Sequence, residues 1–149
     1  MNTNDILKYV HELDWNCPND IQRKAINFLS KIDEEYVGQI FHKELKSTWE
    51  NAVKVIEKIG FPKNKSVLPD LVWLLQDVNW PGAKQAIEIL SSMEKTILIP
   101  IIENALLSAE ATSDTMWISG INLFVKKVGY SCDDFGDKKI FELLKMADF

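Results

Sequence analysis

Residues able to do chemistry are few in this sequence, and they are scattered. Asp134, Phe135 and Gly136 spell the tripeptide that binds magnesium in protein kinases, but no glycine-rich loop, strand lysine or catalytic-loop sequence precedes it. His11 and His42 fall on separate predicted helices, without an HExxH motif or a carboxylate at ligand spacing. These residues therefore predict neither phosphoryl transfer nor a metal site.

Two acidic runs, residues 33–35 and 133–134, offer carboxylates for calcium binding or for acid–base catalysis. Both fall at helix entries or in loops, where the helix dipole and solvation explain them. Serine and threonine occur mostly at helix starts, where capping explains them, and nothing in the sequence brings a histidine to one of them. We therefore expect a non-enzymatic protein with no catalytic residue, cofactor or metal.

Composition and charge limit the classes of partner that the chain is expected to bind. The chain has 149 residues, enough for one domain with a sizeable core, and a net charge of −5 from 17 basic and 22 acidic residues. Arg23 is the single arginine, and lysines alternate with acidic residues, so we expect no nucleic-acid partner. Cys17 and Cys132 form no CxxC motif. The sequence lacks a signal peptide and a membrane span, which favours a cytoplasmic location and no membrane partner.

The elements that must position any site are helices, and residues 68–90 show the pattern most clearly. Apolar residues recur every three or four positions from Leu68 to Val78 and again from Ala83 to Met93, which predicts two amphipathic helices. Residues 79–82, Asn-Trp-Pro-Gly, interrupt the pattern as a tight turn. Two helices joined by so short a turn must lie antiparallel.

The same spacing predicts helices along the rest of the chain and no strand. Three local signals stand out: Thr3 or Asn4 as the first cap, a capping box from Ser47 to Glu50, and Pro100 in the first turn of a helix capped by Thr96. The expected further helices carry the apolar stripes of residues 6–13, 21–32, 36–41, 49–59, 97–109, 117–128 and 140–144.

The two halves of the chain resemble each other in order and in residue type. The matching segments are residues 13–15 with 78–80, 25–30 with 86–91, and 49–60 with 117–129. Repeated helix hairpins are typical of an α-solenoid, so we predict an all-α, HEAT-like α-α superhelix of about nine helices. Its single domain, residues 1–149, would comprise a diverged first repeat (1–60), a second repeat (66–129) and a C-terminal capping helix (130–149).

Residues 74–81, Leu-Leu-Gln-Asp-Val-Asn-Trp-Pro, carry a family likeness. Together with the Pro-Asp-Leu at residues 69–71, they resemble the bacterial domain of unknown function 5071 family, a small HEAT-like helical domain. The likeness covers about residues 68–129. The first half departs from it, because no proline follows Trp15 and a loop is inserted at residues 17–20. The family implies a fold but no catalytic residue.

The five tryptophans are the main candidates for recognition. Trp49 and Trp117 begin apolar stripes and are expected in the core. Trp15 and Trp80 occupy equivalent inter-helix turns, where each indole is expected to plug the hairpin end, the alternative being an exposed anchor for a partner. Trp73 lies off the buried stripe, so it is either covered by a neighbouring hairpin or an exposed anchor. Around it we expect a protein-binding surface formed by Trp73, Gln76, Asp77, Trp80, Lys84 and Gln85.

The leading functional hypothesis is a HEAT-like module that binds a protein or peptide partner through one face. An immunity or antitoxin-type factor that neutralises a basic toxin is one form of it, because opposite charge accelerates association. The alternative is an enzyme of the HEAT-like DNA glycosylase type, which the acidic charge and the single arginine oppose. A homo-oligomer built on an apolar repeat face is a third alternative.

Overall fold

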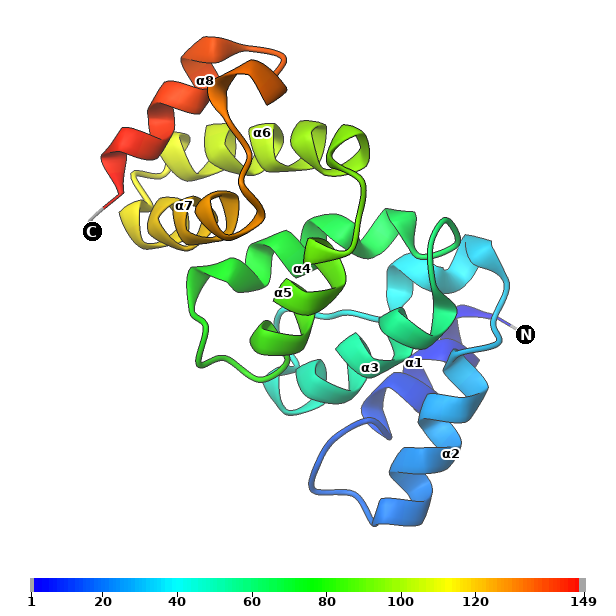
Figure 1. Ribbon diagram of the computed structural model, residues 1–149. Helices are drawn as coiled ribbons and strands as arrows, with labels where there is room; N and C mark the ends of the chain where they lie inside the picture. The colour runs from blue at the N-terminus through cyan, green and yellow to red at the C-terminus, as the bar shows by residue number, and fades with distance from the viewer. Residues whose placement is uncertain (1, 148–149) are drawn as a thin grey trace. The chain divides into compact units, whose positions relative to one another are not determined.

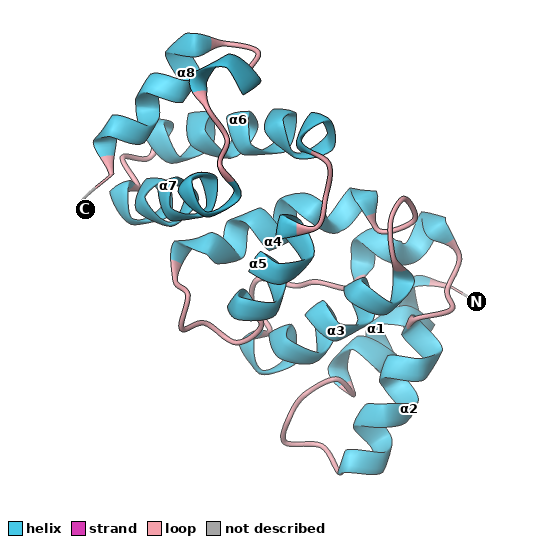
Figure 2. Cartoon of the chain, viewed as in Figure 1, coloured by secondary structure: helices cyan, strands magenta, loops and turns pink. Residues whose placement is uncertain are grey.

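A computed structural model describes residues 2–147, and every regular element in that range is a helix (Figures 1 and 2). It has eight α-helices and six 3-10 helices over these residues. Each of the nine predicted segments is helical, which confirms the all-α class. The superhelical arrangement stays a prediction. The chain divides into two compact units, Met1–Leu68 and Pro69–Phe149.

Unit 1 is built around its second helix, which packs against both the first and the third. Asn51 lies buried among them, and its amide donates to the Leu13 carbonyl at 2.7 Å and to the Gln22 side chain at 2.9 Å. The core contains Ile6, Leu29 and other apolar side chains with no exposed surface. The elements are α1 (Thr3–His11), α2 (Asn19–Leu29), η1 (Glu34–Gln39), η2 (Lys46–Thr48), α3 (Trp49–Ile59) and η3 (Lys65–Val67).

Three local predictions in unit 1 are wrong. Asn2, not Thr3 or Asn4, caps α1, in a capping box with Asp5. The third predicted helix is the 3-10 helix η1 rather than an α-helix. No Ser47–Glu50 capping box forms, because the Ser47 hydroxyl donates to the Asp14 carboxylate at 2.8 Å instead. A partner 33 residues away in the sequence has thus displaced a local cap.

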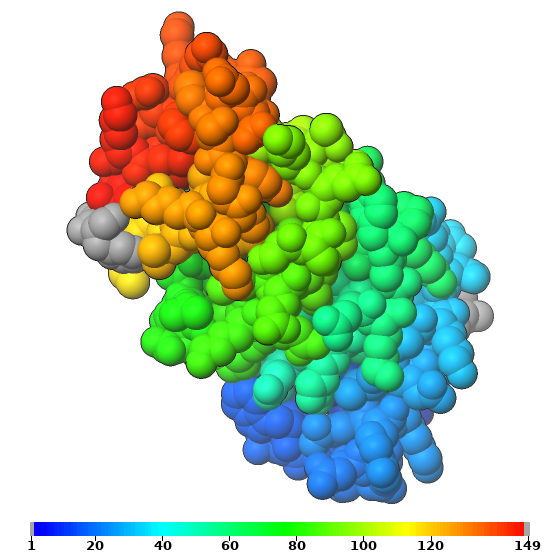
Figure 3. Space-filling model, viewed as in Figure 1, coloured from blue at the N-terminus to red at the C-terminus, as the bar shows by residue number. Residues whose placement is uncertain are grey.

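Unit 2 is built around α7, which packs against η4, α6 and the C-terminal η6. In Figure 1, α6 and α7 run side by side, and in Figure 3 the red and orange surface of the C-terminal segment adjoins them. The elements are α4 (Leu68–Trp73), which begins at the unit boundary, η4 (Leu74–Gln76), α5 (Ala83–Ser91), α6 (Lys95–Ala111), α7 (Thr115–Val128), η5 (Cys132–Asp134), α8 (Lys138–Glu142) and η6 (Leu143–Met146).

The predicted helix over residues 68–78 ends earlier than its apolar pattern. After Trp73 the chain tightens into η4, which ends at Gln76. Val78 therefore lies beyond the helix, and 48% of its surface is exposed instead of buried. The turn at residues 79–82 forms as predicted, with Gly82 in the left-handed region (φ 84°) just before α5.

Helix α6 begins at Lys95 with Glu94 as its N-cap, two residues before the predicted start. Thr96 is therefore inside the helix and does not cap it. Pro100 becomes the sixth helical residue, so the prediction that it lies in the first turn is wrong. Its missing N–H removes the bond that this position would otherwise donate to the Thr96 carbonyl.

The C-terminal segment packs against α6 and α7. Phe135 is buried and meets Phe141 edge-on, with ring centroids 5.0 Å apart. The Lys95 ammonium lies 2.7 Å from the Asp134 carboxylate, which lowers the pKa of Asp134 and raises that of Lys95. Within residues 2–147, no helix combines the length and the apolar character needed to cross a membrane.

Candidate functional site

Unit 2 carries an apolar groove between the end of η4 and α7, with a cavity volume of about 360 Å³. Helix α7 forms one wall with residues spaced for a single helix face, and α5 adds one apolar side chain. The residues that line this apolar groove are Leu75, Gln76, Asp77, Val78, Ile87, Met116, Gly120, Leu123, Phe124 and Lys127.

The groove exists because α7 approaches the backbone of η4 very closely. A Cβ atom added at Gly120 would lie 1.7 Å from the Leu75 carbonyl oxygen, so only glycine fits there. The Trp117 indole donates to the Val72 carbonyl at 3.0 Å, and the Asp114 side chain caps α7 by accepting from the Trp117 amide at 3.0 Å. These contacts fix the two walls of the groove at a short distance from each other.

Three exposed apolar side chains stand on the groove. Val78, Met116 and Leu123 are 48%, 64% and 53% exposed, which places them among the most exposed large apolar residues of the described chain. A contiguous apolar patch of this kind is typical of a surface that contacts a partner. Phe124 lies beneath them, 3% exposed, as part of the core.

Two charged side chains line the groove, Asp77 and Lys127. Asp77 also shapes the adjoining turn, because its carboxylate accepts from the Asn79 amide at 2.8 Å and its carbonyl accepts from the Trp80 amide at 3.0 Å. An apolar floor with one carboxylate and one ammonium is suited to orient an apolar ligand with polar flanks.

The predicted binding residues separate into groups. Gln76 and Asp77 line the groove. Trp73 and Trp80 are half-buried and pack on each other, with ring centroids 5.1 Å apart and an interplanar angle of 34°. Lys84 is exposed and Gln85 is half-buried on α5, and neither lines the groove. The structure therefore brings two of the six residues to this site.

Sequence reasoning missed the apolar residues of the groove. It assigned Val78 to a buried stripe, whereas the early end of the helix exposes it. Met116 and Leu123 lie seven residues apart and off the buried stripe of α7, so this second stripe was visible in the sequence. The close contact of Gly120 is with Leu75, which is distant in the sequence, so no local sequence pattern predicts it.

The remaining tryptophans divide between core and surface. Trp49 is buried as predicted, and its indole donates to the His42 carbonyl at 2.8 Å. Trp117 was expected in the core but is only half-buried, and its indole donates to the Val72 carbonyl. Trp15 is 47% exposed, so its predicted role as a hairpin plug is wrong. Its backbone amide donates to the Ser47 carbonyl at 3.1 Å.

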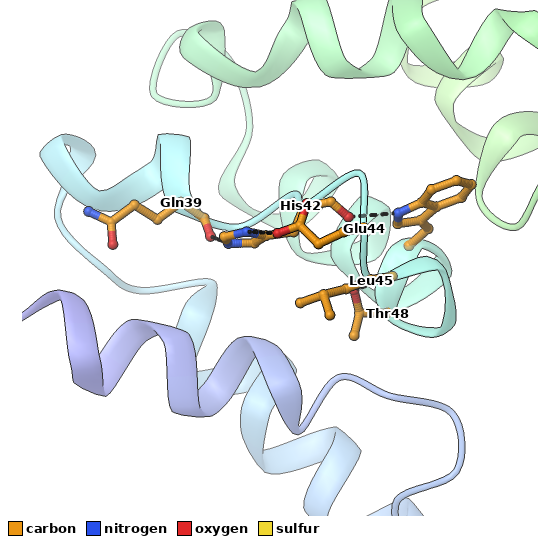
Figure 4. Close-up of polar contacts among 6 residues, drawn as sticks. Gln39, His42, Glu44, Leu45 and Thr48 are labelled. Carbon is orange, nitrogen blue, oxygen red and sulfur yellow. Dashed lines mark hydrogen bonds and ion pairs between the residues drawn. The ribbon is translucent and has the colours of Figure 1, made fainter.

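The residues considered for catalysis or metal binding do not converge. His42 lies in the loop after η1, where Nε2 is 2.7 Å from the Gln39 carbonyl and Nδ1 is 3.4 Å from the Glu44 carboxylate (Figure 4). His11 is the exposed last residue of α1. Between residues 2 and 147, no three His, Cys, Asp or Glu side chains are grouped as metal ligands. Asp134 is engaged by Lys95 and by the Ser131 amide.

Comparison with known proteins assigns the chain to a family. The family model described as a domain of unknown function (DUF5071) matches residues 45–134. The chain belongs to this family. The match begins well before residue 68, so α3 is part of the family domain, and all residues of the apolar groove fall within it. No curated protein and no solved structure matches the chain.

Proposed function

We propose that this DUF5071 protein is a non-enzymatic module that binds another protein through the apolar groove of unit 2. The observation that carries the proposal is the exposure of Val78, Met116 and Leu123 on one hollow surface. Burying apolar surface contributes about 25 cal/mol per Å² removed from water, so covering these side chains favours association. A methionine beside aliphatic side chains also lets the surface adapt to the shape of its partner.

The expected partner segment is an amphipathic helix or extended peptide with large apolar side chains. Asp77 and Lys127 supply opposite charges among the lining residues, which would select the direction in which that segment lies. A rigid wall set by Gly120 reduces the entropy that the groove loses when it binds.

The chemistry of the lining supports a non-enzymatic role. It contains one carboxylate and one ammonium and no imidazole, thiol or hydroxyl group. The serine–histidine and cysteine–histidine pairs of nucleophilic catalysis therefore have no member in the groove. Cys17 and Cys132 are free thiols, which is consistent with the reducing cytoplasm, and we propose a cytoplasmic location on that basis.

A narrower form of the proposal is an immunity or antitoxin-type role, with a basic toxin as the partner. The net charge of −5 supports it, because a negative field accelerates encounter with a positive protein. Recovery of only neutral or acidic partners from the native host would contradict this narrower form and leave the groove proposal standing.

The test is quantitative affinity purification of the full chain from its native host, with two matched variants. Leu123→Glu places a charge in the groove, and Leu107→Glu places the same charge on α6, where Leu107 is 45% exposed and outside the groove. We expect Leu123→Glu to lose a partner that wild type and Leu107→Glu retain. Identical partner sets for all three proteins would refute the proposal.

A further inference from the structure

Unit 1 carries a second hollow of a different character, lined by residues of α1, of α2 and of the turns that follow them. Its cavity volume is about 520 Å³. Three lysines, Lys8, Lys24 and Lys31, line it, and Glu12 is the only carboxylate among the lining side chains. We refer to it as the basic hollow. It lies outside the residues matched by the family model.

The floor of the basic hollow is aromatic. Tyr9 of α1 and Phe28 of α2 stack with ring centroids 3.9 Å apart and an interplanar angle of 21°. Both rings are half-buried, and the Lys8 ammonium lies 5.6 Å from the centre of the Tyr9 ring. Ile21, also half-buried, extends this apolar floor along α2.

Helical spacing brings the charges to the same side as the floor. Lys24, Phe28 and Lys31 follow one another at intervals of four and three residues, so they share one face of α2 and its C-terminal turn. Across residues 2–147, no carboxylate lies within salt-bridge distance of Lys8, Lys24 or Lys31. In a protein of net charge −5, three unpaired ammonium groups on one hollow form a local positive field.

We propose that the basic hollow binds a small ligand that combines phosphate groups with a planar apolar ring, the class to which nucleoside phosphates belong. Lysine ammonium groups bind phosphate as point charges, and an aromatic floor packs against a planar ring. The volume lies within the roughly 300–1,000 Å³ of small-molecule sites. This site is separate from the protein-binding groove, and its test does not depend on that proposal.

A small ligand fits the hollow better than an acidic protein segment does. The site is confined to two short helices, whereas a specific protein interface buries about 800 Å² on each partner. The aromatic floor would also contribute little to binding a purely acidic peptide. The ring and the phosphates must therefore act together, and this distinguishes the proposal from general attraction of anions.

The experiment is an NMR titration of the ¹⁵N-labelled full chain with four probes, ATP in the presence of EDTA, adenosine, inorganic triphosphate and a hexaglutamate peptide. We expect ATP to shift the amide signals of residues 8–12 and 21–31. We expect adenosine and triphosphate each to bind about tenfold more weakly than ATP. Absence of shifts with millimolar ATP, or equal binding of hexaglutamate, would overturn the proposal.

Two double variants with the same change of net charge separate the site from diffuse electrostatics. Lys24→Gln with Lys31→Gln removes two charges from the hollow, and Lys54→Gln with Lys58→Gln removes two exposed charges from α3. We expect the first to weaken ATP binding about tenfold and the second to leave it within about twofold of wild type. Equal weakening by both would overturn the proposal. Circular dichroism of each variant verifies the fold.

A third variant tests the ring. The double variant Tyr9→Leu with Phe28→Leu keeps an apolar floor but removes both aromatic rings. ATP binding should fall to the level of inorganic triphosphate, while triphosphate binding stays unchanged. If ATP still bound more tightly than triphosphate in this variant, the aromatic floor would not be the ring site, and the proposal would fail.

Discussion

The apolar groove of unit 2 and the basic hollow of unit 1 are both hollows bordered by packed helices, yet they are built differently. The groove is set by backbone contact, since Gly120 places α7 directly against the Leu75 carbonyl. The hollow is set by side chains, since Tyr9 and Phe28 stack above the contact between α1 and α2. One surface is apolar with two opposite charges, and the other is lysine-rich over an aromatic floor.

The two surfaces therefore differ in what determines them, which is backbone packing in the groove and exposed side chains in the hollow. A surface fixed by backbone contact depends on the fold, so changes in its supporting residues should affect stability. A surface fixed by exposed side chains should change its binding with little effect on the fold. The groove lies within the DUF5071 match and the hollow outside it, so the two surfaces are also separable by sequence segment.

The largest effect is expected from Gly120→Ala. The new Cβ would overlap the Leu75 carbonyl oxygen, which must move away and disturb the contact between η4 and α7. Overpacking of this kind costs about 3 kcal/mol in the free energy of unfolding. Urea denaturation measures it.

Gly38→Ala in unit 1 is the matched control. The nearest atom to its added Cβ would be the Ser66 hydroxyl at 4.0 Å, an ordinary contact. Its stability should stay within about 0.5 kcal/mol of wild type. If Gly120→Ala were as stable as Gly38→Ala, the groove would not depend on close backbone packing.

Sequence reasoning succeeded where the determining interactions are local. Apolar spacing located all nine helical segments, because it depends only on residues three or four positions apart. It failed where a distant partner decides the outcome. Ser47 bonds to Asp14 instead of capping α3, and Gly120 owes its role to Leu75.

The candidate sites were harder to predict than the fold for the same reason. The alternation of lysines with acidic residues along the chain predicted only that nucleic acid is not a partner. Packing of α1 on α2 gathers Lys8, Lys24 and Lys31 on one hollow, which no local pattern records. Gln76 and Asp77 were predicted as part of a surface around Trp73 that helix packing does not explain, and both line the groove.

The structure also changes the alignment of the two halves of the chain, in which residues 13–15 were matched with residues 78–80. Asp14 and Asp77 each accept a hydrogen bond at 2.8 Å from the amide two residues later. When the two halves are aligned on this turn, Trp15 corresponds to Val78 and not to Trp80. Trp15 is 47% exposed and Val78 is 48% exposed. Equivalent exposed positions thus carry an indole in unit 1 and an aliphatic side chain on the groove in unit 2.

The next effect concerns a hydrogen bond that each unit contains, from a tryptophan indole to a backbone carbonyl. Trp49 donates to the His42 carbonyl and Trp117 to the Val72 carbonyl. Replacement of either by phenylalanine leaves a carbonyl without that donor, which should cost about 1–2 kcal/mol in the free energy of unfolding. Thermal and urea denaturation measure both.

Trp15→Phe serves as the control for both tryptophans, because the exposed ring of Trp15 should tolerate the change within about 0.5 kcal/mol. A Trp117→Phe variant as stable as Trp15→Phe would show that the Val72 bond does not hold α7 in place.

A smaller effect concerns the pKa values of Asp14 and Asp134, whose carboxylates bind partners of different charge. The Asn16 amide and the Ser47 hydroxyl, both uncharged donors, lower the pKa of Asp14. In unit 2 the Lys95 ammonium is the main cause of the lowered pKa of Asp134. Each group stabilises the fold above its unfolded pKa, and that stability is lost as pH falls through its lower folded pKa.

The pKa values of Asp14 and Asp134 should respond differently to salt. Raising sodium chloride from about 20 mM to about 500 mM should move the pKa of Asp134 upward toward its usual value and leave that of Asp14 nearly unchanged, because screening acts on the charged pair. Carboxyl ¹³C shifts followed against pH report both values. Equal salt responses would contradict the assigned causes.

The smallest effects on stability are expected at the exposed side chains of the two sites. Leu123→Ser on the groove and Lys31→Gln on the hollow should each change the free energy of unfolding by less than about 0.5 kcal/mol. Both residues are exposed, so neither change opens a cavity. A loss above about 2 kcal/mol at either position would mean that the residue belongs to the core.

Photo-crosslinking in the native host tests the central claim, that the groove binds a protein, most directly. A benzophenone amino acid replaces Met116, which is 64% exposed on the groove, or Leu107, which is 45% exposed on α6 outside it. We predict that illumination yields a discrete crosslinked protein from position 116 and not from position 107. No crosslink at 116, or the same products from both positions, would contradict the assignment of the groove as a binding site.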